Sequence, residues 1–68
     1  MKPEWLIRAE EEQQLLQERI TRLSKVLAFG DLSLVDSNDL FEQRKAMIEY
    51  NAALSRRIKR HGGTVVST

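Results

Sequence analysis

Apolar side chains recur along residues 3–28 at the spacing of a single helix face. They follow one another in steps of three, four and seven, the pattern of a helix that packs against a partner helix. The positions are Leu6, Ala9, Leu16, Ile20, Leu23 and Leu27. Gln13 takes the polar place in this stripe, and Pro3 suits a first helical turn because its missing N–H is not needed there. The pattern predicts a helix from about residue 3 to residue 28.

A second stripe predicts a helix over residues 36–61. Leu40, Met47, Leu54 and His61 are spaced by seven, and Phe41, Ile48, Tyr50 and Ile58 widen the stripe. Asp36 opens a run of capping residues and is the predicted N-cap, with Val35 and Leu40 as a hydrophobic staple across it. Two glycines, Gly62 and Gly63, should stop the helix. Residues 62–68 are therefore predicted to form a flexible tail.

The connection over residues 29–35 is short but strongly apolar. Gly30 suits a left-handed C-cap at the end of the first helix. Four large apolar side chains follow or flank it, and a solvated loop would not need them: Phe29, Leu32, Leu34 and Val35. We expect them to fold over the closed end of the structure.

Two helices joined by so short a connection should form an antiparallel hairpin, so the predicted fold class is all-α. A chain of 68 residues has a marginal core, and a lone hairpin covers only part of each apolar stripe. We therefore expect a homodimer that packs as a four-helix bundle. The predicted dimer and core residues are Leu16, Ile20, Leu23, Leu27, Leu40, Met47, Tyr50, Leu54 and Ile58.

Composition narrows the possible functions. The chain has a net charge of +1 and no cysteine, which fits a soluble protein of the reducing cytoplasm. No uncharged apolar run approaches the roughly 18 residues of a membrane span, and Glu4 comes too early for a signal peptide. One histidine and dispersed carboxylates offer no metal site and no catalytic group. We expect a non-catalytic protein without metal or cofactor.

The basic end of the second helix is the sharpest local feature. Arg56, Lys59 and Arg60 share a helix face opposite Ile58, and Arg57 lies at its edge. One interpretation is a contact for phosphate or nucleic acid. The other is structural, because a helix C-terminus favours cations and the antiparallel partner brings the glutamates of residues 10–12 alongside. The structural interpretation is favoured here.

Further residues have both structural and functional interpretations. Gln13 and Asn51 either form a polar pair that sets the register inside the bundle or lie at its rim in water. His61 stands alone at a helix terminus, where a capping or packing role outweighs a role as ligand. Trp5 and Tyr50 suit partner contacts but fit the inner face of the bundle at least as well.

The apolar pattern also resembles a group of small, mostly uncharacterised helical-hairpin proteins of bacteriophages and prophages, related to those of crAss-like phages. The resemblance covers about residues 10–58, with Phe41 in place of the usual second leucine. It is carried by Glu18-Arg19-Ile20, Leu23, Val26-Leu27, Phe29, Leu34, Leu40-Phe41, Gln43, Met47, Tyr50, Leu54 and Arg57-Ile58. It implies an accessory protein made in the cytoplasm of an infected host, and brings no catalytic residue.

Two functional hypotheses follow. The first is an interaction protein that binds and modulates a host regulator or defence component through apolar surface outside the seam. The second is a nucleic-acid- or nucleotide-binding protein that uses the basic end. Together they give the candidate partner-binding residues Trp5, Ile7, Leu15, Val26, Arg56, Arg57, Lys59 and Arg60.

Overall fold

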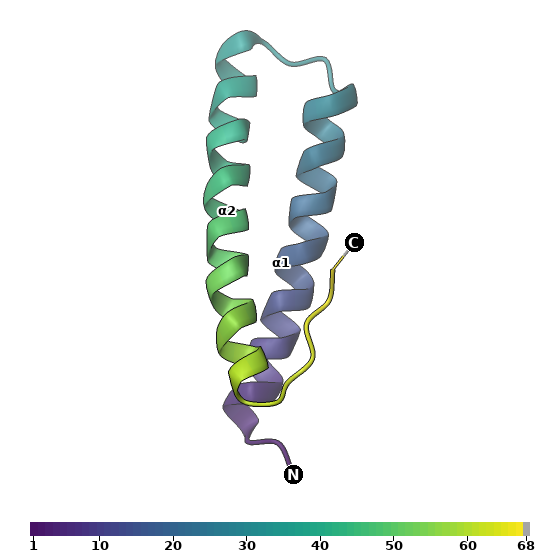
Figure 1. The fold of residues 1–68 in the computed structure, drawn as a ribbon. Coiled ribbons are helices and arrows are strands. Elements are labelled where there is room, and N and C mark those ends of the chain that lie inside the picture. The colour runs from purple at the N-terminus through teal and green to yellow at the C-terminus, as the bar shows by residue number, and fades with distance from the viewer. Residues whose placement is uncertain (68) are drawn as a thin grey trace.

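A computed structural model describes residues 1–67 as an elongated helical hairpin of about 48 × 16 × 16 Å. Helix α1 spans Glu4–Phe29 and helix α2 spans Leu34–Arg60. They lie side by side and run in opposite directions, with the N-terminus at the end away from the connection (Figure 1). The predicted all-α hairpin is confirmed. Thr68, the last residue of the expected tail, lies outside the described residues.

The end of α1 differs from the prediction. The backbone N–H of Gly30 donates to the carbonyl of Val26 at 2.7 Å, which closes the helix. Gly30 has φ −76° and ψ 151°, so it is extended rather than left-handed. Glycine is favoured there because a Cβ would come within 2.4 Å of the Val26 carbonyl oxygen.

The N-cap of α2 is Ser33, and the prediction of Asp36 was wrong. The Ser33 hydroxyl accepts a hydrogen bond from the backbone N–H of Asp36 at 3.2 Å. Serine and aspartate both cap helices well. Because the cap is Ser33, Leu34 and Val35 belong to the first turn of the helix. Val35 therefore lies inside the helix and not before its cap, where a staple residue would stand.

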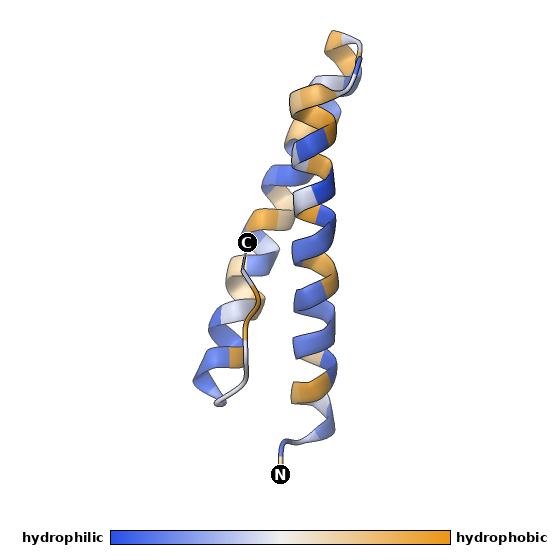
Figure 2. Ribbon diagram, turned by 90° about the vertical axis from the view of Figure 1, so that its right-hand side faces the viewer, coloured by the Kyte–Doolittle hydropathy of each residue, from blue (hydrophilic) through white to orange (hydrophobic). Residues whose placement is uncertain are grey.

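The connection does not fold over the closed end as expected. Phe29, Leu34 and Val35 are 87%, 77% and 70% exposed, and only Leu32 is half-buried. Figure 2 shows hydrophobic stretches, in orange, in both helices close to the connection. This end of a single chain is apolar and uncovered.

The core lies at the opposite end, in the tail half, defined as residues 1–20 and 51–67. Its buried side chains are Leu6, Ala9, Gln13, Leu16, Ile20, Leu54 and Ile58. Val65, from the segment after α2, packs against the apolar cluster at its centre. The chain turns at Gly62, where φ is +77°, and runs back along α1 (Figure 1). The tail thus packs against α1 where a flexible segment was expected.

The loop half, defined as residues 23–47, is less well covered. Its predicted seam residues are half-buried: Leu23, Leu27, Leu40 and Met47. Of the nine predicted core residues, four are therefore buried in one chain and four are half-buried. The ninth, Tyr50, is 47% exposed, and its hydroxyl donates to Glu12 Oε1 at 2.6 Å.

Candidate functional site

A polar network joins the two helices across the middle of the hairpin. The amide nitrogen of Gln13 donates to Asn51 Oδ1 at 3.1 Å, and Asn51 Nδ2 donates to Gln17 Oε1 at 3.2 Å. Gln13 is fully buried. Gln13 thus lies inside the hairpin, with the half-buried Asn51 as its partner. A shifted helix alignment would leave the buried amide without this partner, which favours the interpretation of a register-setting pair.

Arg44 makes a second polar contact between the helices. Its Nε donates to Ser24 Oγ at 2.7 Å, and that hydroxyl donates in turn to the carbonyl of Ile20 at 2.8 Å. Arg44 was not among the predicted site residues. Its signal was in the sequence: Leu40, Arg44, Met47 and Asn51 follow in steps of four, three and four, which places Arg44 on the seam.

A groove of about 540 Å³ opens beside this network, between the helices. Apolar, amide, hydroxyl and cationic side chains share its wall. The lining residues are Gln17, Ile20, Thr21, Ser24, Lys25, Ala28, Phe29, Arg44, Ile48 and Asn51. The groove therefore combines hydrogen-bonding groups and two cations with an exposed aromatic ring.

The loop half carries large apolar side chains that a single chain leaves exposed. Besides the connection, Val26 is 42% and Phe41 55% exposed, and Ile48, one residue beyond this half, is 39% exposed. The other predicted apolar contact residues, Ile7 and Leu15, are 43% and 53% exposed, but they lie on α1 in the tail half. The structure thus brings Val26, and not Ile7 or Leu15, together with the loop-half surface.

The basic end of α2 is exposed: Arg56, Arg57, Lys59 and Arg60 all face solvent. Within residues 1–67 the ion pairs are Lys2–Glu10 at 2.7 Å and Arg8–Glu4 at 2.6 Å. The expected neutralisation of Arg56 and Arg57 by the glutamates of residues 10–12 is therefore not found among them. Arg56, Lys59 and Arg60 are therefore exposed cations without an ion pair among the described residues.

An aromatic cluster adjoins the basic end. The rings of Trp5 and His61 meet edge to face with centroids 4.8 Å apart, and the Arg57 guanidinium lies 4.9 Å from the Trp5 ring centroid. His61 is the C-cap of α2, one residue beyond the helix that was predicted to include it. His61 therefore packs and caps, while Trp5, 38% exposed, keeps part of its ring accessible.

Two ionisable groups within residues 1–67 have shifted pKa values, and hydrogen bonds are the main cause of both shifts. Lys2 and the backbone N–H of Thr64 lower the pKa of the Glu10 carboxyl. The hydrogen bond to the Glu12 carboxylate raises the pKa of the Tyr50 hydroxyl. Across residues 1–67, no group of three or more His, Cys, Asp or Glu side chains is placed to hold a metal ion. No helix in the same range is long and apolar enough to cross a membrane.

The fold and these surfaces define a small helical hairpin with the features of a binding protein. The chain belongs to the Sequestin family, whose model matches residues 3–60, a family of small phage-related proteins. The match covers both helices and ends before the tail. Comparisons with curated proteins and with solved structures give no match.

Proposed function

We propose that this chain is a non-catalytic binding protein, encoded by a phage of the crAss-like kind, that sequesters a partner in the host cytoplasm. The observation that carries the proposal is the exposed apolar surface of the loop half, which a single chain leaves in water. Contiguous apolar surface of this kind marks interaction sites. The family name, Sequestin, suggests a binding or sequestering protein.

The first partner of this surface is a second copy of the chain. Leu23, Leu27, Leu40 and Met47 are half-buried in the hairpin, and a second hairpin packed on the loop half would bury them. Burial stabilises by roughly 25 cal/mol for each Å² of apolar surface removed from water. This supports the homodimeric four-helix bundle as the binding form.

A host protein is the first candidate for the sequestered partner. Phe29, Leu34 and Val35 project from the end of the hairpin, beyond the seam that a second copy would cover, and they are its most exposed large apolar side chains after Met1. A few buried side chains supply most of the energy of a protein contact, and covering these three would remove exposed apolar surface from water. We infer that the dimer contacts a host regulator or defence component through these side chains.

A phosphate-bearing ligand, either a nucleic acid or a nucleotide, is the second candidate. Two observations favour it. The cations of the basic end are not ion-paired within residues 1–67. The interhelical groove places Lys25 and Arg44 near the Phe29 ring, an arrangement in which cations contact phosphate and an aromatic ring stacks on a base. The structure thus gives this candidate more support than the sequence did.

One experiment separates the candidates. The tagged protein is incubated with host lysate that ultrafiltration has divided into macromolecules and small molecules, and bound material is identified by mass spectrometry.

Variants show which surface is used. Phe29→Asp should abolish capture of a protein partner, while Arg56→Gln/Lys59→Gln/Arg60→Gln and Lys25→Gln/Arg44→Gln should leave it intact. For a phosphate-bearing ligand, one of the cation variants should lose capture, and binding should weaken with added salt. No specific capture from either fraction would contradict the proposed function.

A further inference from the structure

The C-terminal tail is joined to α1 through both backbone polar groups of Val66, its N–H and its C=O. Gln13 Nε2 donates to the carbonyl of Val66 at 2.7 Å, and the backbone N–H of Val66 donates to Gln13 Oε1 at 2.8 Å. The Gln13 side chain thus binds residue 66 as a neighbouring strand would, through its N–H and its C=O. Because Gln13 is fully buried, loss of the tail would leave an amide that needs new partners.

Glu10 supplies a second latch, one helical turn before Gln13. Its Oε2 accepts from the backbone N–H of Thr64 at 2.6 Å and from Lys2 Nζ at 2.7 Å. One carboxylate therefore holds the tail and the N-terminal segment against the same face of α1. Residues three apart on a helix share a face, so Glu10 and Gln13 form a continuous seat for the tail.

The turn that returns the tail to α1 depends on two glycines. Gly62 has φ +77°, a conformation that favours glycine. A Cβ on Gly63 would lie 2.6 Å from Ile58 Cγ2 and 3.0 Å from Leu6 Cδ1. The backbone of Gly63 therefore rests directly on the hydrophobic core, and the path of the tail is closely fitted to it.

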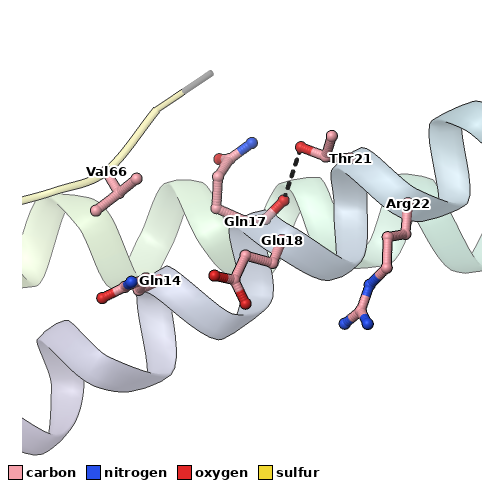
Figure 3. A pocket seen from close by; sticks show the side chains of 6 residues that line it. All are labelled: Gln14, Gln17, Glu18, Thr21, Arg22 and Val66. Carbon is pink, nitrogen blue, oxygen red and sulfur yellow. Dashed lines mark hydrogen bonds between the residues drawn. The ribbon is translucent and has the colours of Figure 1, made fainter.

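The two valines of the tail differ in burial. Val65 packs on the buried cluster, whereas Val66 is 40% exposed. Figure 3 shows Val66 beside the face of α1 that carries Gln14, Gln17 and Glu18. Val65 thus covers core side chains that would otherwise meet solvent or another chain.

The tail and a second hairpin would compete for the same apolar seam. The α1 seam runs in steps of three and four through both halves: Leu6, Ala9, Gln13, Leu16, Ile20, Leu23 and Leu27. Over residues 6–13 the tail packs against it, while beyond Ile20 the seam is only half-buried. A second copy that followed the seam along its full length would have to displace the tail.

We propose that residues 62–67 act as a strap, latched to α1 by Glu10 and Gln13, that confines self-association to the loop half. Release of the strap extends the contact surface for a second copy along the tail half. This inference rests on the self-association proposed above and is independent of the partner that the protein sequesters.

The test uses a change confined to the tail. Val66→Pro removes the N–H that donates to Gln13 and leaves both helices untouched. Ser67→Pro, one residue further on, is the matched control. Amide hydrogen exchange of Thr64 is measured by NMR, because its N–H donates to Glu10 in the strapped state. We expect protection of this amide in the natural protein and in the control, and its loss in Val66→Pro.

Self-association of the same three proteins is then measured by sedimentation. Release should lower the dissociation constant by about tenfold or more, the change expected when additional apolar surface is buried. An unprotected Thr64 amide in the natural protein would overturn the inference, since there would be no latch. Loss of protection in Val66→Pro without tighter association would also overturn it, because the tail would then restrict nothing. Neither result depends on capture of a host partner.

Discussion

The same apolar seam runs through both halves of the hairpin, but its side chains are buried in the tail half and only half-buried in the loop half. In the tail half, Leu6 and Ile58 are 1% and 0% exposed, because Val65 adds a third layer to the two helices. In the loop half no segment of residues 1–67 forms such a third layer, and Phe41 is 55% exposed. A two-helix chain therefore needs another segment to close its core, and only the tail half supplies that segment from within.

The largest expected effect comes from truncating the closed core. Ile58→Ala should lower the free energy of unfolding by ~2–5 kcal/mol, because a fully buried side chain leaves a cavity. Met47→Ala, at a half-buried loop-half position, should cost less in the monomer, and its cost should grow as dimer forms. Thermal denaturation at low and high protein concentration measures both. Equal, concentration-independent losses would remove the distinction between the halves.

Removal of the inner polar pair ranks second. Gln13→Ala deprives Asn51 and the tail of hydrogen bonds and should cost ~1–3 kcal/mol, the range for leaving buried polar groups unsatisfied. Gln14→Ala, on the exposed neighbouring position, should change stability within about 0.5 kcal/mol. Chemical denaturation compares the two variants. A loss no greater for Gln13→Ala would show that the network contributes little to the fold.

The Glu10 latch should respond to acid. The pKa of Glu10 in the folded chain lies below its ordinary value of 4.5, so the ionised carboxylate stabilises the folded form above that value. This contribution is lost as the pH falls through the lowered pKa. The amide shift of Thr64 should follow that titration in NMR spectra. Glu10→Gln should abolish the titration, whereas Glu11→Gln should preserve it.

The smallest expected effect on stability comes from the basic end. Arg56→Gln/Lys59→Gln/Arg60→Gln should leave the fold and its association intact, because these side chains are exposed and not ion-paired within residues 1–67. Only the favourable helix-terminus interaction is lost, at ~0.3–1 kcal/mol per charge. Circular dichroism and melting curves check this. Unfolding of the triple variant would place the cations in a structural role.

Much of the hairpin was predictable from periodicity. The spacing from Leu6 to Leu27 gave a helix whose ends differ by one residue from those of α1, because a long amphipathic pattern constrains its helix strongly. The start of α2 was predicted less accurately. Ser33 and Asp36 are both good caps, and the local sequence does not decide between them. Arg44 was missed because spacing by sevens skips the intermediate seam position.

The role of the tail was not visible in the sequence. Its five residues after the glycines carry no helical or strand pattern long enough to read, and its position depends on contacts with residues more than fifty positions away, at Glu10 and Gln13. The sequence showed Gln13 as the polar position in an apolar stripe and suggested Asn51 as its partner on the other helix. It did not indicate the hydrogen bonds between Gln13 and the backbone of Val66.

The central claim is that the loop half is a contact surface and that a second chain covers it. Multi-angle light scattering at micromolar concentration tests this most directly, on the natural protein and on Phe41→Asp, with the exposed substitution Glu42→Ala as control. We expect a mass of twice the 7.9 kDa chain for the natural protein and the control, and the mass of one chain for Phe41→Asp. A fully helical natural protein with the mass of one chain would contradict this claim.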